Sequence, residues 1–265
     1  MSLFINPSSV IHALTLAIVV SLSAPSSFAE TALDYTILEK QPHDPKIFTQ
    51  GFYIEDNMSY ESSGLFGRSF VRVYETETRQ IYAEKELPHN IFAEGITLFN
   101  DHLYLLTWKS EQALLLNPKT LELISQYSYA GEGWGITHTD KELITSDGSH
   151  NLYFRNPNTF NITRSISVHN AWRRYKHLNE LEFAQSAIWA NVWQSDLILK
   201  ISPKDGQVLG VANFKALAKE NRSYNKQQNV LNGIAYDKQR DAFWITGKFW
   251  PYQYLIKFKT KHEQR

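Results

Sequence analysis

The motif Phe92-Ala93-Glu94-Gly95 carries the residue types that proton-transfer chemistry requires. In an extended segment Phe92 and Glu94 point to the same side, so the carboxyl group would lie beside an aromatic ring. Desolvation at such a place raises a carboxyl pKa and suits the group to proton transfer near neutral pH. The spacing alone is equally compatible with a structural carboxylate that accepts hydrogen bonds from backbone amides.

Similar phrases recur along the chain at intervals of roughly 40 to 50 residues, a period typical of propellers and other repeat arrays. They occupy residues 48–51, 92–95, 131–135, 178–182 and 231–233. If the repeats surround an axis, the polar residue within each phrase faces a shared centre; these residues are Gln50, Glu94, Glu132, Asn179 and Asn232. Further polar and aromatic candidates follow second strands of the repeats: Trp108, Trp193 and Lys248.

Each repeat reads as short strands separated by turns, with alternating hydrophobic residues. In the second repeat the expected strands are 95–99, 102–108, 113–116 and 123–129. The last repeat is one strand short, and the alternating segment 35–40, which precedes the first repeat, can supply it. Closing a ring in this way removes exposed sheet edges. The sequence therefore predicts an all-β, five-bladed propeller of four-stranded blades, closed by an N-terminal strand that joins the last blade.

Two segments interrupt this rhythm. Residues 170–177 are basic and aromatic, and residues 216–229 look helical at the start and polar thereafter. We expect both to be solvated loops, although long loops at one end of a propeller can also shape the mouth of its site.

The bulk composition limits the classes of partner. The 265 residues include 27 Lys and Arg against 27 Asp and Glu, so no net field exists to attract nucleic acid. There is no cysteine, which removes disulfides and thiolate chemistry. Aromatic residues make up 14% of the chain, more than a plain scaffold needs, and some of these rings are expected to line a site.

The N-terminal segment resembles an export signal. Residues 10–22 are largely apolar but too short for a membrane span, and Ser27-Phe28-Ala29 fits the small-x-small cleavage rule. We expect residues 1–29 to be a signal peptide and residues 30–265 to form a single propeller domain, exported to a periplasm or secreted. The alternative is an N-terminal helix packed on the domain. The mature protein is expected to be a monomer without a stable membrane anchor.

Several familiar enzyme motifs are absent from the sequence. It contains no Gly-x-Ser-x-Gly, His-Glu-x-x-His, Walker or dinucleotide-binding motif. The nine His are scattered at spacings that do not indicate a metal site. A zinc mechanism is therefore poorly supported.

Taken together, the motifs resemble those of the plant and bacterial type of glutaminyl-peptide cyclotransferase, a five-bladed propeller family. The resemblance runs in order through nearly the whole mature chain and rests on residues 48–51, 60–69, 92–95, 106–109, 131–135, 146–149, 178–182, 190–193, 229–237 and 246–251. It implies an enzyme that converts the N-terminal glutamine of peptides or proteins to pyroglutamate with release of ammonia. It also implies catalysis without a metal or other cofactor, and is compatible with a structural calcium ion.

The resemblance further implies the site residues. Catalytic roles fall to Glu94 as general acid/base, to Asn179 and to Lys248. The family pattern implies substrate contacts from Phe48, Gln50, Phe92, Trp108, Trp134 and Trp193. We expect Asn179, Gln50 and the Trp108 indole N–H to hold the amide and its developing oxyanion, and the remaining rings to form walls that exclude water.

Two alternatives belong to other functional classes. The first is a propeller that binds a peptide N-terminus or another small ligand without catalysis. The second is a calcium-dependent hydrolase of the lactonase kind, with Glu94, Asn179 and Asn232 as oxygen ligands around the axis. Lys248 has its own alternative, a structural ion pair in the last blade.

Overall fold

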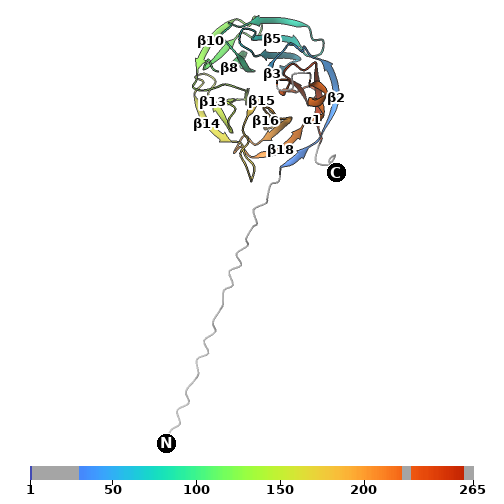
Figure 1. The fold of residues 1–265 in the computed structure, drawn as a ribbon. Coiled ribbons are helices and arrows are strands. Elements are labelled where there is room, and N and C mark those ends of the chain that lie inside the picture. Colours follow the sequence, from blue (N-terminus) through green and yellow to red (C-terminus); the bar gives the residue numbers. More distant parts are fainter. Residues whose placement is uncertain (2–29, 223–227, 260–265) are drawn as a thin grey trace.

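Five β-sheets surround a common axis in the computed structural model, which describes Met1, residues 30–222 and residues 228–259 (Figure 1). The strands of blades 1 to 3 are β3 (Thr49–Glu55), β4 (Met58–Ser63), β5 (Phe70–Glu75), β6 (Ile81–Glu86), β7 (Ala93–Phe99), β8 (His102–Thr107), β9 (Gln112–Leu116), β10 (Leu123–Ser128), β11 (Ile136–His138), β12 (Leu143–Ser146), β13 (Asn151–Arg155) and β14 (Ile162–Ser167). Blades 4 and 5 contain β15 (Leu178–Ala184), β16 (Ala187–Val192), β17 (Leu197–Ile201), β18 (Val208–Asn213), β19 (Leu231–Asp237), β20 (Ala242–Gly247) and β21 (Tyr252–Phe258). The predicted five-bladed propeller is confirmed.

Two strands from the start of the described chain complete the ring. β2 (Tyr35–Pro42) pairs antiparallel with β21 and is the outermost strand of blade 5. β1 (Thr31–Leu33) pairs parallel with β18 and gives blade 4 a fifth strand, which the sequence analysis did not predict. In Figure 1 this N-terminal part lies on the rim of the ring, next to the C-terminal blade.

Both irregular segments lie between strands. Residues 170–177 form a connection with only an isolated bridge between His169 and Arg174. The second contains one short helix, α1 (Lys215–Asn221). The predicted signal peptide lies outside the described residues, apart from Met1. Within the described ranges, no helix has the length and apolar character needed to cross a membrane.

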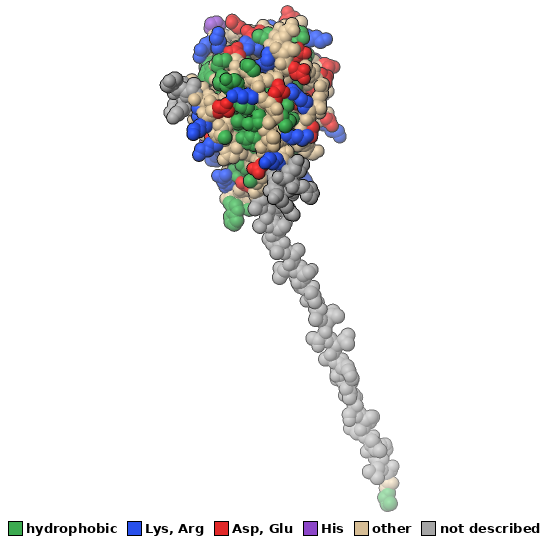
Figure 2. Space-filling view, turned by 90° about the vertical axis from the view of Figure 1, so that its right-hand side faces the viewer, with side chains coloured by type: hydrophobic (Ala, Val, Ile, Leu, Met, Phe, Trp, Pro, Cys, Tyr) green, Lys and Arg blue, Asp and Glu red, His purple; other side chains and the backbone are tan. Residues whose placement is uncertain are grey.

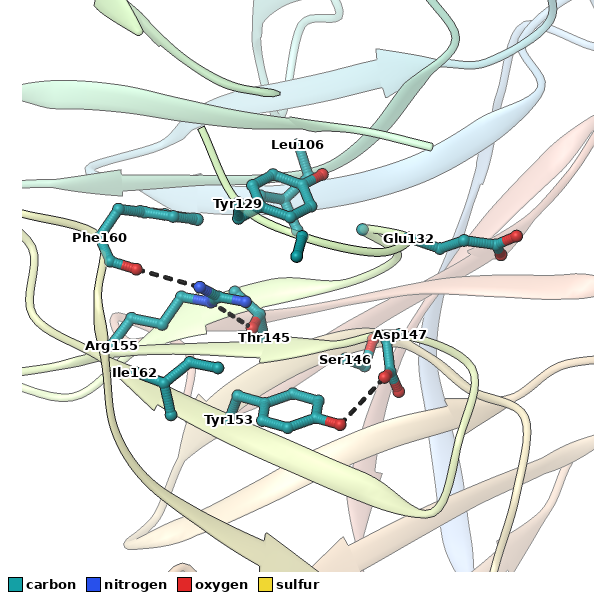
Figure 3. A pocket seen from close by; sticks show the side chains of 12 residues that line it. Leu106, Tyr129, Glu132, Thr145, Ser146, Asp147, Tyr153, Arg155, Phe160 and Ile162 are labelled. Carbon is teal, nitrogen blue, oxygen red and sulfur yellow. Dashed lines mark hydrogen bonds between the residues drawn. The ribbon is translucent and has the colours of Figure 1, made fainter. Parts of the chain in front are cut away.

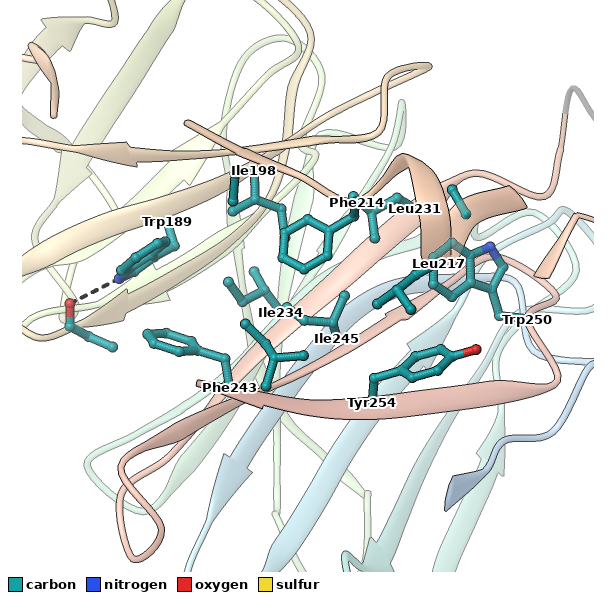
Figure 4. Close-up of a cluster of buried hydrophobic side chains, with 14 residues drawn as sticks. Trp189, Ile198, Phe214, Leu217, Leu231, Ile234, Phe243, Ile245, Trp250 and Tyr254 are labelled. Carbon is teal, nitrogen blue, oxygen red and sulfur yellow. Dashed lines mark hydrogen bonds between the residues drawn. The ribbon is translucent and has the colours of Figure 1, made fainter. Parts of the chain in front are cut away.

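Apolar side chains from facing blades form the core. Between blades 4 and 5, Trp189 packs against Phe243 with ring centroids 4.8 Å apart, and Ile234 and Ile245 belong to the same cluster (Figure 4). Removing such rings and branched chains from water is the main favourable contribution to folding. On the outside, positive and negative side chains are interspersed over the face shown in Figure 2, consistent with the balanced composition.

The innermost strands of neighbouring blades approach one another at backbone distance. A Cβ atom on Gly51 of β3 would lie 2.4 Å from the backbone nitrogen of Ile96 in β7, and one on Gly95 would lie 2.5 Å from the nitrogen of Ile136 in β11. Only glycine allows two backbones to come this close. The glycines of the repeated phrases therefore set the diameter of the ring at its axis.

Replacing Gly51 with alanine should destabilise the protein by about 1–3 kcal/mol, because backbone atoms of the next blade must move to accept the methyl group. Gly210→Ala is the matched control, since the three atoms nearest to its Cβ all belong to the side chain of Leu33 and that side chain can rotate. Denaturant unfolding of both variants measures the difference. Equal free energies of unfolding would show that the inner backbone contact does not limit stability.

Candidate active site

A cavity of about 240 Å³ lies at one end of the innermost strands. Its walls contain all nine residues predicted as site residues, together with Leu65; they are Phe48, Gln50, Leu65, Phe92, Glu94, Trp108, Trp134, Asn179, Trp193 and Lys248. These residues come from all five blades, so the cavity exists only when the ring is assembled.

Two structural positions of the blades supply most of this lining. One is the start of the innermost strand, where Gln50, Glu94 and Asn179 lie in β3, β7 and β15. The other is the residue directly after the second strand, where Trp108, Trp193 and Lys248 follow β8, β16 and β20. The same two positions in successive blades thus carry different side chains, all of which line the cavity.

A break in strand pairing accompanies each of the inner positions. The register shifts between Thr49 and Gly51, between Ala93 and Ile96, and between Leu178 and Leu181. Such bulges redirect a side chain out of the alternation of the strand and often adjoin active sites. The shift places Gln50, Glu94 and Asn179 in the cavity wall instead of the interface between blades.

Glu94 is the buried acid of the cavity. Burial raises the pKa of Glu94 well above its usual value, the Lys248 ammonium opposes this increase, and the charge of Glu132 adds to it. Glu94 Oε1 accepts a hydrogen bond of 2.8 Å from Gln50 Nε2. A carboxyl group with a raised pKa is suited to accept and return protons near neutral pH.

Lys248 is the cation of the cavity and is also buried. Desolvation lowers the pKa of Lys248 to about 8, although the Glu94 carboxylate acts in the opposite direction. Its Nζ lies 4.6 Å from the centre of the Phe48 ring. Lys248 is therefore placed to respond to charge in the cavity, beside the acid and an aromatic wall.

The aromatic rings pack edge to face around the cavity. Trp134 and Trp193 have centroids 5.6 Å apart at 89°, and Phe92 and Trp108 have centroids 5.3 Å apart at 61°. Phe66 packs on Phe92 at 5.3 Å and is largely exposed. Rings held in this way give rigid apolar walls that keep water from a bound side chain.

The indole N–H of Trp108 has a partner within the protein. It donates a hydrogen bond of 2.8 Å to Glu132 Oε2, and the Trp134 indole donates to the same oxygen at 3.0 Å. The structure therefore offers the ring of Trp108, and not a free N–H group, to a ligand. Glu132, one of the polar residues of the repeated phrases, therefore holds two rings of the wall by hydrogen bonds without lining the cavity itself.

The two asparagines of the repeated phrases have different surroundings. Asn179 is buried in the cavity wall and its Oδ1 has no hydrogen-bond partner among the described residues. Asn232 does not line the cavity; its Nδ2 donates to the backbone oxygen of Thr49 at 2.9 Å and lies 3.4 Å from Gln50 Oε1. The Oδ1 of Asn232 also lacks a partner among the described residues, but Asn232 lies outside the cavity lining. Asn179 is thus available to a ligand in the cavity, whereas Asn232 braces the strand that carries Gln50.

Leu65 is the cavity residue that was not predicted. Its φ of 97° lies in the left-handed region, which is unfavourable for a branched residue. Its carbonyl oxygen accepts hydrogen bonds from Arg68 N and Ser69 Oγ, which hold this conformation. Its place in the glycine-bounded stretch 64–67 was the available signal. Within the described residues, no cluster of three or more His, Cys, Asp or Glu has a geometry suited to a metal ion.

Comparison with known proteins adds independent information. The sequence matches the glutamine cyclotransferase family over residues 10–258. It is 36% identical over 226 residues to the glutaminyl-peptide cyclotransferase of Arabidopsis thaliana, covering 84% of this chain and 71% of that protein. The crystal structure of Myxococcus xanthus glutaminyl cyclase matches with a TM-score of 0.81 and 30% identity, covering 87% of this chain and 99% of the other.

A more distant structure shares the fold alone. The WD40 β-propeller domain of Doa1 matches with a TM-score of 0.51 at 8% identity, over 80% of this chain and 64% of that one. The family match over most of the chain and the two relatives at 30% identity or more confirm the resemblance inferred from the motifs. This chain belongs to the glutamine cyclotransferase family.

Proposed function

We propose that this protein is a glutaminyl-peptide cyclotransferase that converts the N-terminal glutamine of peptides or proteins to pyroglutamate and ammonia. The observation that carries the proposal is a cavity in which a buried carboxyl group, a buried amine and an unpartnered amide oxygen face one another within aromatic walls. Membership of the glutamine cyclotransferase family supports the same reaction.

In the proposed reaction the neutral α-amine attacks the side-chain amide carbon of the same residue. The new carbon–nitrogen bond closes a five-membered ring, and the amine loses a proton to the Glu94 carboxylate. Glu94 then returns a proton to the amide nitrogen, which leaves as ammonia when its bond to carbon breaks. Because ring closure is intramolecular, the protein contributes chiefly by holding the reactive conformer and by moving protons.

Asn179 and Lys248 act on the reacting amide in this proposal, and Gln50 acts through Glu94. Asn179 presents its unpartnered oxygen to the amide or the α-amine, and Gln50 fixes the Glu94 carboxyl through its own side-chain amide. The Lys248 ammonium stabilises the negative charge that develops on the carbonyl oxygen, a contribution of a few kcal/mol in preorganised sites. Since the Trp108 N–H donates to Glu132, we assign Trp108 to the aromatic wall.

We also propose that the reaction needs no metal ion. In the calcium-dependent alternative, Asn232 would be a ligand through its Oδ1, which has no hydrogen-bond partner among the described residues, yet Asn232 does not line the cavity. The Lys248 ammonium acts directly on Glu94 and would oppose a dication at that carboxylate. The donor set therefore suits an amine and an amide better than a calcium ion.

The Glu94→Gln variant tests the acid/base role. It should lower kcat on a short Gln-initiated peptide by about 10² to 10⁴-fold, since a glutamine side chain cannot transfer the proton. Removing a buried ionisable group should leave thermal stability intact, which circular dichroism would verify. Ammonia release and the matching mass loss of the peptide measure the reaction.

Glu220→Gln, at an exposed ion pair, is the control. Wild-type turnover by Glu94→Gln would refute the role, and an inactive wild-type protein that still binds the peptide would favour the non-catalytic alternative.

The Lys248→Met variant tests the electrostatic coupling. The Lys248 cation lowers the Glu94 pKa, so its loss should raise that pKa and move the acid limb of the kcat/KM profile to higher pH. Lys257→Met, at an exposed ion pair with Asp241, should leave the profile unchanged. An acid limb at the wild-type position in Lys248→Met would mean that the two groups do not interact during catalysis.

Chelation tests metal independence. Treating the purified protein with a strong chelator, followed by removal of the chelator and its complexes, should leave kcat and KM unchanged. Complete loss of activity that returns on addition of calcium would instead favour the calcium-dependent hydrolase. Thermal unfolding in the same samples separates a structural ion, whose loss lowers the unfolding temperature, from a catalytic one.

A further inference from the structure

Glu132 joins two walls of the cavity through one oxygen atom. Its Oε2 accepts the indole N–H of Trp108 at 2.8 Å and that of Trp134 at 3.0 Å. Trp108 follows β8 of blade 2, and Trp134 precedes β11 of blade 3. One carboxylate therefore fixes the orientation of two rings that belong to different blades.

A third group completes the surroundings of this carboxylate. Lys109 Nζ lies 3.6 Å from Glu132 Oε1 and 4.1 Å from the centre of the Trp108 ring. Desolvation raises the pKa of Glu132, but the hydrogen bonds from Trp134 and Trp108 and the charge of Lys109 outweigh it and lower the pKa below its usual value. Glu132 is thus ionised at neutral pH, and a charged acceptor makes the stronger hydrogen bonds.

Glu132 also lines the neighbouring cavity between blades 2 and 3. That cavity contains Arg155, whose guanidinium donates to Thr145 Oγ1 and to the carbonyl oxygen of Phe160. Figure 3 shows Glu132 at the border of this cavity with its carboxylate extending away from Arg155.

The backbone around Glu132 is held by bonds of its own. Gly133 N donates to the carbonyl oxygen of Trp108 at 3.1 Å, and Gly95 N donates to that of Trp134 at 2.6 Å. Gly131 N donates to Glu111 Oε1 at 3.0 Å. These bonds fix the path of the chain without the Glu132 carboxylate, so the carboxylate acts on the indole rings and not on the fold.

We propose that Glu132 is a positioning residue that locks the planes of the Trp108 and Trp134 indoles so that the cavity holds the substrate in its reactive conformer; this rests on the proposed function. Without an acceptor, each indole can rotate within its side-chain torsion wells and the wall loses its shape. A displacement of about 1 Å at a reacting group can lower the rate on the order of 10²-fold. The effect should therefore fall mainly on kcat.

The test uses the full chain with ¹⁵N-labelled tryptophan, so that the indole N–H signals report on their hydrogen bonds whether or not the protein is active. Trp108→Phe and Trp134→Phe assign the two signals. Glu132→Ala should move both signals toward the positions of solvent-bonded indoles. Glu111→Gln, which alters a carboxylate of the same region and keeps an oxygen that can accept from Gly131 N, should move neither.

Kinetics on a Gln-initiated peptide complete the experiment. Glu132→Ala should lower kcat by about 10 to 10²-fold with a smaller change in KM. Glu132→Gln should recover part of the loss because its amide oxygen still accepts an N–H group. In a Trp108→Phe background, Glu132→Ala should cost less than in the wild type, because one of its two partners is already gone.

The outcomes are distinguishable. Unmoved indole signals, or a wild-type kcat in Glu132→Ala beside an active wild-type enzyme, would overturn the positioning role. If Glu132→Gln were no better than Glu132→Ala, the accepted hydrogen bonds would not be its basis. Shifted signals in a protein whose wild type does not cyclise the peptide would contradict the proposed function and leave the positioning of the rings supported.

Discussion

The structure depends on the contact between backbones at the axis of the ring. Gly51 and Gly95 let the innermost strands of neighbouring blades meet without side chains between them. In blade 4 the matching register position is held by Glu180, whose carboxylate accepts hydrogen bonds from Phe52 N at 3.3 Å and Ile234 N at 2.8 Å. The axis is therefore closed by glycine contacts on one side and by a buried carboxylate on the other.

This contact also creates the site. The residue next to the close approach cannot continue the strand pairing, and the resulting bulge turns its side chain toward the cavity. Gln50 and Glu94 directly precede the glycines that need the space, and Asn179 directly precedes Glu180. Close packing at the axis thus also brings polar side chains together in the cavity. Burial of these groups raises the pKa of Glu94 and lowers that of Lys248.

Prediction from the sequence succeeded where one blade repeats another. The recurring phrase and the strand pattern were enough for the five blades. The position within the phrase was correct for Gln50, Glu94 and Asn179, which line the cavity, and wrong for Glu132 and Asn232, which do not. The pairing of β1 with β18 and the partners of Glu132 were not predictable in this way. The parallel pairing of Thr31–Leu33 joins segments distant in sequence, and the acceptor of the Trp108 N–H depends on how blade 2 meets blade 3. Leu65 was missed because leucine disfavours the left-handed conformation that this residue adopts. Local hydrogen bonds to its carbonyl oxygen hold that conformation, and the sequence does not show them.

The closure of the ring by β2 determines when folding of the propeller can be completed. Residues 35–42 of β2 pair with residues 252–258 of β21. β2 is synthesised early, but it cannot pair until almost the entire chain has been made. A nascent chain can form blades 1 to 4 in order, but blade 5 and the Lys248 side of the cavity require the C-terminal strands. Pairing over such a sequence distance is slow, because loop closure must precede the contacts that stabilise it. The cavity lined by Lys248 is consequently one of the last features to form.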